Sequence, residues 1–410
     1  MASNPAMESN PAKSQTLTMA MESNPAKRQT LTMVMESNPA KRQTLTMATE
    51  SNPAKRQTLT VAMESNPAKR QKTFSAVPVI DFSGLSDPIK RSFICAQVAQ
   101  ASETVGFFEV INSSVPLDVV GDAFAINRKF FELPKEEKLS LRVDNENKKR
   151  LVPFQLGYKH FPMLRTTENR MEELVFRDYH LRPRDAPEDT YSNGYKGPVD
   201  STKNWWPVNP PEYRDKVERL TAELGKLGDT LLDVFSESLG LPPSHIRLKH
   251  HKNASVPRYL NFHHYPKSTK PQVEETGITP HKDSSVFTIV AQCDGEKGLE
   301  INPDGEWISV MPQRGGLIVN VGDILQAWSN GRFRSIFHRV ISNHDTGRYS
   351  FAYFCFPAPG FEADCIIKPV AELITREKPA TYVPFTYLDF FLTKMQKNSV
   401  TLLQSLQANS

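Results

Sequence analysis

With 410 residues, 39% of them hydrophobic, the chain is long enough to bury one large sheet-based core. With 50 lysines and arginines against 46 acidic residues, the formal net charge is only +4. Much of this basic excess lies in the first 72 residues, which argues against a nucleic-acid-binding surface in the rest of the chain. No stretch approaches the roughly 20 apolar residues that span a bilayer, no hydrophobic signal core opens the chain, and the four cysteines lack disulfide spacing. These features predict a cytoplasmic protein with reduced thiols.

A tandem repeat dominates the first 76 residues. A unit such as residues 21–34 (MESNPAKRQTLTMV) recurs with a period of 14 in five copies, which begin at residues 7, 21, 35, 49 and 63. A repeat can build a solenoid when each unit buries an apolar face, but a typical copy offers only Leu and one or two Met beside an Asn-Pro break. Such a composition cannot offset the entropy of ordering, so we predict a disordered tail, with an interaction or targeting segment as the alternative.

Order is expected to begin near Val77, where helical patterns follow. Apolar residues recur at helical spacing over residues 87–104, 117–131 and 211–239, and each segment ends just before a glycine or proline. A closing helix is predicted at residues 386–402, whereas residues 139–207 are rich in loops. The apolar stripe of the long helix is expected to pack against a sheet.

From residue 257 onward the pattern changes to short strands with glycine-containing turns. Seven strands are predicted, at residues 258–265, 285–292, 298–301, 306–310, 316–321, 335–342 and 349–356. They indicate an α+β, mainly β fold with a double-stranded β-helix (jelly roll) core flanked by helices, able to hold a metal between its sheets.

The domain organisation follows from these elements. We divide the chain into disordered repeats at 1–76, an N-terminal helical and strand region at 77–200, and a part at 201–410 that holds the long helix, the jelly roll and the closing helix. Residues 77–410 are expected to form one structural unit.

Two imidazoles and one carboxylate predict a metal site among these strands. His281 and Asp283 project together if residues 279–290 form one strand, because residues i and i+2 point to the same face. His338 must come from elsewhere, since a third ligand on that strand could not complete a facial arrangement. Imidazole and carboxylate together suit Fe(II), and three ligands on one face leave the opposite face open. An isolated His-x-Asp pair is usually solvated, but the second histidine and the motif after it favour the metal.

That motif is Arg348-Tyr349-Ser350, ten residues past the second histidine. Arg348 and Ser350 should share a face of a strand. A guanidinium binds a carboxylate through two parallel hydrogen bonds, to which a neighbouring hydroxyl can add a third. A surface ion pair is the usual fate of an arginine, yet one strand after a metal-binding histidine we expect a site for a small dicarboxylate.

An ordered series of blocks from residue 77 to about 395 resembles the 2-oxoglutarate- and Fe(II)-dependent dioxygenases of the isopenicillin N synthase-like family. The blocks are VPVIDF (77–82), GFF (106–108), FFELPKEEK (130–138), HKDSS (281–285), GLEI (298–301), GEWI (305–308), NVGD (320–323), SNG (329–331), SIFHRV (335–340) and RYS (348–350). The resemblance implies an iron-binding catalytic centre of His281, Asp283 and His338, and a 2-oxoglutarate site of Arg348, Ser350 and Tyr265. The family often has Asn two residues before that tyrosine, where this chain has His263.

The activity that the resemblance implies is a dioxygenase reaction of secondary metabolism. O2 and 2-oxoglutarate are consumed, succinate and CO2 are released, and a small organic metabolite is hydroxylated, desaturated or cyclised. Two alternatives are a same-fold Fe(II) oxidase that uses no 2-oxoglutarate, and a catalytically inactive jelly-roll ligand-binding protein. The expected partner is a small-molecule substrate, with no nucleic acid and no membrane, and the expected state is a monomer.

Overall fold

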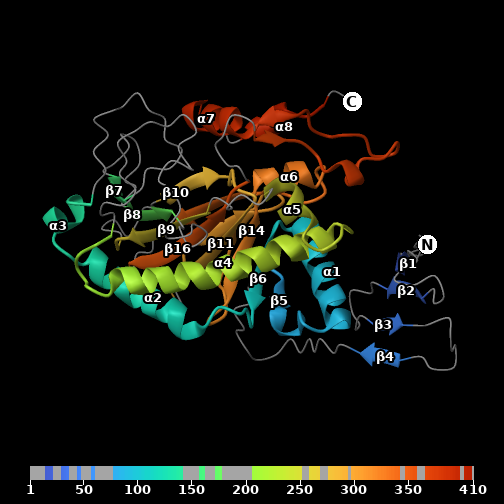
Figure 1. Ribbon diagram of the computed structural model, residues 1–410, viewed down its shortest axis with the longest axis horizontal. Coiled ribbons are helices and arrows are strands. Elements are labelled where there is room, and N and C mark those ends of the chain that lie inside the picture. The colour runs from blue at the N-terminus through green and yellow to red at the C-terminus, as the bar shows by residue number, and fades with distance from the viewer. Residues whose placement is uncertain are drawn as a thin grey trace, which may run out of the picture. The chain divides into compact units, whose positions relative to one another are not determined.

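The computed structural model consists of two compact units, Met1–Lys72 and Thr73–Ser410 (Figure 1). The larger unit is described at residues 77–141, 157–161, 171–177, 206–251, 258–267, 276–293, 297–341, 347–357, 365–397 and 401–408, and the smaller one at its strands. The expected boundary at residue 200 falls outside the described residues and stays a prediction.

The described residues of the smaller unit form four strands inside the repeats. They are β1 (Ser14–Met21), β2 (Gln29–Glu36), β3 (Thr44–Met47) and β4 (Gln57–Thr60). The strands β1 and β2 pair antiparallel, as do β3 and β4. Each strand contains the Thr-Leu-Thr segment of its repeat, where β-branched threonines favour extended backbone. A two-stranded hairpin is marginally stable at best in water, so the disorder expected for these repeats in solution stays a prediction.

The larger unit is built on an eight-stranded sheet, called the major sheet. In spatial order its strands are β5 (Val79–Asp81), β6 (Phe107–Ile111), β14 (Leu317–Val321), β11 (Phe287–Gln292), β16 (Arg348–Cys355), β9 (Arg258–Tyr265), β8 (Met171–Arg177) and β7 (Gly157–Phe161). All neighbours are antiparallel except β5 and β6, which are parallel.

A four-stranded minor sheet faces one side of the major sheet. Its strands, in spatial order, are β10 (Thr276–His281), β15 (Phe337–Ile341), β12 (Leu299–Asn302) and β13 (Ile308–Ser309). Buried apolar side chains of both sheets form one cluster, with Phe107 and Ile318 from the major sheet and Leu299 and Ile301 from the minor sheet. The two packed sheets confirm the predicted jelly roll, and the predicted strands agree with the observed ones to within about three residues at each end.

Helices cover the opposite side of the major sheet and close the ends of the unit. They are α1 (Pro88–Thr104), α2 (Leu117–Phe131), α3 (Lys135–Leu139), α4 (Tyr213–Ser238), α5 (His245–His251), α6 (Asp323–Trp328), α7 (Tyr387–Lys397) and α8 (Leu402–Ser405). Short elements complete the unit: the 3-10 turns Phe82–Gly84 and Ala371–Leu373, and the paired strands β17 (Ile366–Ile367) and β18 (Phe385–Thr386). None of the described helices combines the length and hydropathy needed to cross a bilayer.

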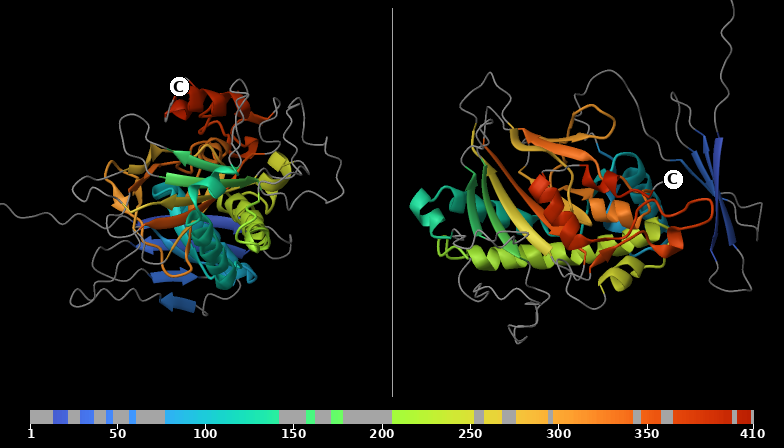
Figure 2. Two further views of the ribbon diagram at one scale, coloured as in Figure 1. Left: turned by 90° about the vertical axis from the view of Figure 1, so that its left-hand side faces the viewer. Right: turned by 90° about the horizontal axis from the view of Figure 1, so that it is seen from above.

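The longest helix, α4, runs along the major sheet in Figures 1 and 2. Its apolar residues, including Leu220, Leu224 and Leu231, are fully buried. Phe235 contacts Phe287 of β11 with ring centroids 5.5 Å apart. The stripe therefore packs against a sheet, as its spacing predicts, and it holds the major sheet rigid from behind.

A buried ion network fixes the far edge of the major sheet. Glu172 of β8 accepts hydrogen bonds from Lys138 Nζ at 2.6 Å and from Tyr158, and its other oxygen lies 2.7 Å from His264 Nδ1. Burial alone would raise the pKa of Glu172, but the hydrogen bonds from His264, Lys138 and Tyr158 lower it to about 2. The network connects β7, β8, β9 and α3, and His264 also stacks on Tyr349 with centroids 4.5 Å apart.

The substitution Glu172→Gln should lower the free energy of unfolding near pH 7 by about 3 kcal/mol, because Lys138 loses a buried counter-charge. The folded pKa of Glu172 lies below its ordinary value of 4.5, so its stabilisation is complete above that value and is lost as the pH falls toward 2. Urea unfolding between pH 3 and 7 should show a shallower pH dependence in the variant. The control Glu218→Gln breaks only an exposed pair with Arg214 and should cost under about 0.5 kcal/mol; equal losses in both variants contradict the network's role.

Candidate metal centre

Three side chains able to bind a metal ion converge between the two sheets. His281 is the last residue of β10 and is paired directly with His338 of β15. The Nε2 atom of each imidazole lies 3.5 Å from Oδ1 of Asp283, and the three donor atoms all lie within 4.8 Å of one another. Within the described parts of the chain, no other group of three or more His, Cys, Asp or Glu side chains is arranged to hold a metal ion.

Asp283 reaches this position by a different route from the predicted one. The strand β10 ends at His281 and β11 begins at Phe287, so residues 279–290 do not form one strand and that prediction is wrong. The chain crosses here from the minor to the major sheet. Asp323 N and Gly322 N donate to the carbonyl oxygens of Asp283 and Val286 at 2.8 and 2.9 Å, which anchors the crossing. The carboxylate therefore faces the imidazoles across the gap between the sheets.

Both imidazole rings are oriented by backbone carbonyl groups. The Nδ1 atom of His281 lies 2.8 Å from Thr279 O, and that of His338 lies 3.4 Å from Ile336 O. A carbonyl oxygen only accepts hydrogen bonds, so these contacts favour a proton on Nδ1 and leave Nε2 of each ring as the atom available to a metal. Phe107 packs edge-on against the His338 ring at a centroid distance of 5.4 Å.

The Asp283 carboxylate is oriented by two side chains of the major sheet. Its Oδ2 atom accepts hydrogen bonds from Thr288 Oγ1 of β11 at 2.6 Å and from Asn320 Nδ2 of β14 at 2.8 Å. These bonds leave Oδ1 directed at the two imidazoles. Neither residue was predicted as part of the site, although Thr288 interrupts the apolar run at residues 286–291 and Asn320 lies in the NVGD block.

The electrostatics of the centre favour the protonation states that a metal requires. Burial alone would raise the pKa of Asp283, but the neighbouring imidazoles of His338 and His281 hold it well below its usual range. Burial lowers the pKa of His338, and the neighbouring His281 lowers it further. An ionised carboxylate and a neutral imidazole are the forms that coordinate cations.

The geometry of this donor set fits a six-coordinate ion. Adjacent ligands at bond lengths of about 2.1 Å lie about 3 Å apart in an octahedral shell. The two Nε2 to Oδ1 distances of 3.5 Å are slightly wider, so a shift of about 0.5 Å would bring the atoms to bonding positions. Two imidazole nitrogens and one carboxylate oxygen on one side of an ion suit Fe(II) and leave the opposite positions open.

A second polar group lies on the same inner face of the major sheet. Arg348 is 1% exposed, and its guanidinium donates to Ser350 Oγ at 2.9 Å and to Gln292 Oε1 at 3.0 Å. Tyr265 pairs with Arg348 in the register of β9 and β16, and the guanidinium lies 5.0 Å from its ring centroid. Burial raises the pKa of Tyr265 to about 12, against the opposing effect of Arg348. The expected face-sharing of Arg348 and Ser350 is confirmed, whereas Gln292 was missed.

The metal-binding and guanidinium groups are connected through β11. Thr288, which bonds Asp283, and Gln292, which bonds Arg348, are four residues apart and point to the same face. Four residues of extended strand span about 13 Å between Cα atoms, and the side chains at both ends shorten the remaining gap. Both groups therefore lie on one face of the major sheet, connected by a single strand.

His263, where the resemblance implies an asparagine, contacts an acid on the neighbouring strand. Its Nε2 lies 3.3 Å from Glu173 Oε1, which also accepts a hydrogen bond from Asn261 Nδ2 at 2.6 Å. These three buried residues form a polar wall on strands β8 and β9. His263 is paired with Ser350 in the sheet, so this wall lies beside the guanidinium group.

Comparison with known families gives two matches along the chain. Residues 252–357 match the model of the 2OG-Fe(II) oxygenase superfamily, and residues 77–207 match that of the non-haem dioxygenase in morphine synthesis N-terminal. The first match contains all of the metal-binding and guanidinium groups, whereas β8 lies in the second match.

Similar proteins match over most of the chain. Flavanone 3-dioxygenase 2 of Oryza sativa subsp. japonica is 32% identical over 78% of this chain and 84% of its own length. Protein DOWNY MILDEW RESISTANCE 6 of Arabidopsis thaliana is 31% identical over 78% and 85%. The crystal structure of JOX2 in complex with 2OG, Fe and JA superposes with a TM-score of 0.65 at 26% identity, covering 81% of this chain and 89% of that one.

Removing one hydrogen bond to Asp283 should weaken metal binding without unfolding the protein. Thr288→Val keeps the side-chain shape but leaves the carboxylate less firmly oriented, so the affinity for Fe(II), measured by anaerobic titration, should fall about 10- to 100-fold. Thr221→Val is the matched control, since it removes a buried hydroxyl on α4 that bonds only a backbone carbonyl. An unchanged affinity in Thr288→Val would show that this bond does not position the carboxylate.

Proposed function

The chain belongs to the 2OG-Fe(II) oxygenase superfamily, and on that basis we propose which of its residues carry the reaction. It is a 2-oxoglutarate-dependent dioxygenase, an oxidoreductase that oxidises a small organic metabolite with Fe(II), 2-oxoglutarate and O2. The observation that carries the assignment of the centre is the convergence of His281, Asp283 and His338 from two sheets.

We propose that His281, Asp283 and His338 hold the iron and form the catalytic centre. When bound, iron activates O2 as 2-oxoglutarate is converted to succinate and CO2, which allows a C–H bond of the substrate to be oxidised. The protein orients the two imidazoles through backbone carbonyls and the carboxylate through Thr288 and Asn320. Phe107 and the apolar cluster between the sheets keep water from the buried side of the centre.

Arg348, Ser350 and Tyr265 are the residues that we assign to 2-oxoglutarate. The guanidinium offers a fork of donors to the distal carboxylate, while the serine hydroxyl and the tyrosine phenol lie beside it. Full burial of Arg348 favours this role, because a guanidinium shielded from water gains more from a bound anion than an exposed one. Gln292 orients the fork by accepting a hydrogen bond from Arg348.

The substrate is expected to be a small secondary metabolite that is hydroxylated, desaturated or cyclised. A relative named for flavanone oxidation supports this class of substrate. The polar wall of Glu173, Asn261 and His263 supports a substrate with at least one hydrogen-bonding group, because Asn261 Oδ1 is buried and has no partner among the described residues. Each such bond adds to discrimination against a purely apolar analogue.

We further infer a monomeric protein in the cytoplasm that acts without a nucleic acid or membrane partner. The four cysteines, all of them among the described residues, support a reducing compartment, since none of them forms a disulfide bond. Size-exclusion chromatography with light scattering and cell fractionation test these two inferences.

Iron-loaded protein incubated with 2-oxoglutarate and a metabolite extract should convert at least one compound to a product that has gained one oxygen or lost two hydrogens. Mass spectrometry should find succinate in equal amount, and His281→Ala should abolish both signals. Product without succinate would indicate the same-fold oxidase, and neither product nor O2 uptake would indicate an inactive binding protein.

Replacing the guanidinium fork should affect the co-substrate but not the metal. Arg348→Lys retains the charge and loses the paired donors, so the KM for 2-oxoglutarate should rise at least tenfold, or about 1.4 kcal/mol, while the bound iron stays near wild type. Arg219→Lys, on the exposed side of α4, serves as the control. An unchanged KM in Arg348→Lys would remove Arg348 from the 2-oxoglutarate site.

A further inference from the structure

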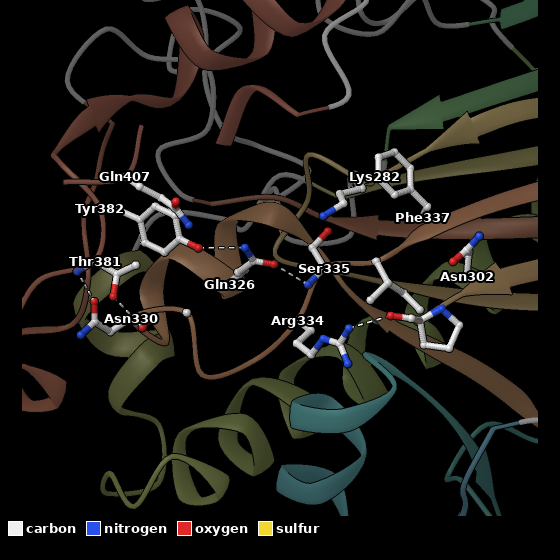
Figure 3. A pocket seen from close by; sticks show the side chains of 13 residues that line it. Lys282, Asn302, Gln326, Asn330, Arg334, Ser335, Phe337, Thr381, Tyr382 and Gln407 are labelled. Atoms are coloured by element: carbon white, nitrogen blue, oxygen red, sulfur yellow. Dashed lines mark hydrogen bonds between the residues drawn. The ribbon is translucent and has the colours of Figure 1, made fainter. Parts of the chain in front are cut away.

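A second pocket lies on the outer face of the minor sheet, away from the metal centre. It has a volume of about 400 Å³, and Lys282, Ser335 and Phe337 are among its lining residues (Figure 3). Phe337 and His338 are consecutive on β15, so they point to opposite faces of the sheet. None of the residues assigned to iron or 2-oxoglutarate lines this pocket. It is therefore separate from the site that carries the oxidation.

The pocket is positively charged. Its lining contains two cations, Lys282 and Arg334, and no aspartate or glutamate, although Arg334 is paired with Asp304 at 3.4 Å outside that lining. The Lys282 ammonium group lies 5.0 Å from the Phe337 ring centroid and forms no ion pair within the described part of the chain. Asp323, a buried carboxylate nearby, is bound to Lys394 at 2.5 Å. The charge of Lys282 is thus left without a direct counter-ion.

A buried hydroxyl of the same pocket also lacks a partner among the described residues. Ser335 is 3% exposed, and its Oγ atom makes no hydrogen bond with the described residues. Its backbone N–H donates to Gln326 Oε1 at 2.7 Å, which fixes the residue in place. Figure 3 shows the end of the Lys282 side chain directed toward Ser335. A buried hydroxyl without a partner is destabilising, and a bound acceptor would remove that cost.

We propose that this pocket binds a small organic anion, with a phosphate or carboxylate group held between Lys282 and Ser335. The ammonium and the hydroxyl both donate to an oxyanion, and the charged bond is the stronger of the two. Gln326 Nε2 donates to the Tyr382 hydroxyl at 2.8 Å, and the second amide hydrogen of Gln326 and the hydroxyl hydrogen of Tyr382 can donate to the rest of the ligand. The volume falls within the usual range for small-molecule sites, so the ligand is larger than a bare phosphate.

Occupation of this pocket would also constrain the metal-binding segment. Lys282 lies between His281 and Asp283 in the chain, and its carbonyl oxygen accepts a hydrogen bond from Lys394 Nζ of α7 at 2.9 Å. An anion that holds the Lys282 side chain would limit the motion of this segment. This consequence rests on the proposed function, whereas binding of the anion does not.

Calorimetric titration of the full-length, metal-free protein tests the site, with inorganic phosphate and succinate as separate probes. At least one probe should bind, and Lys282→Met should weaken its affinity at least tenfold and Ser335→Ala about threefold or more. Lys282→Arg should retain most of the binding. The exposed Lys226→Met is the matched control and should bind as the wild type does. Tighter binding of phosphate than of succinate identifies a phosphorylated ligand, and the reverse identifies a carboxylate.

Arg348→Met distinguishes this pocket from the 2-oxoglutarate site, and it should leave the Lys282-dependent binding unchanged. Circular dichroism checks that each variant is folded. If Lys282→Met does not fold, the affinity of Ser335→Ala for the probe decides whether the proposal holds. The proposal is overturned if neither probe binds, if binding is lost with Arg348→Met, or if Ser335→Ala and Lys282→Met both bind as the wild type does. Because no iron or turnover is needed, the result is independent of the proposed oxidation.

Discussion

The carboxylate of Asp283 interacts with both sheets of the jelly roll at once. One oxygen accepts hydrogen bonds from Thr288 and Asn320 of the major sheet, and the other faces His281 and His338 of the minor sheet. A buried carboxylate is costly unless it is compensated, and here two donors and two imidazoles compensate it. The same contacts hold the donor atoms near bonding positions before any cation arrives, so little reorganisation is required on binding.

Much of the fold could be predicted from the sequence because its elements are strongly patterned. The helix α4 buries one stripe of leucines at helical spacing, and the strands β9 and β16 are rich in aromatic residues, so local pattern alone identifies them. The strand β10 was missed because its short segment TGITPH is mostly partly exposed or exposed and contains a proline. Its pairing with β15, a tertiary contact between distant segments, defines it as a strand.

The candidate site was predictable in its residue types but not in its construction. His281, Asp283 and His338 were identified by chemistry and resemblance, and they do converge. Alternation of side chains along one strand could not account for Asp283, because the chain passes from the minor to the major sheet there. The alternation rule applies only within a single strand. The supporting roles of Thr288 and Asn320 depend on which strands become neighbours, which a single sequence does not state.

The strand β15 contributes alternate residues to the two faces of the minor sheet. His338 and Val340 point inward, while Phe337 and Arg339 lie on the outer, partly exposed side. Inserting or deleting one residue in this five-residue segment would exchange its two faces, placing a phenyl ring where an imidazole belongs. Insertions and deletions in related sequences should therefore occur in the connections before and after β15, while the length of the strand itself should not vary.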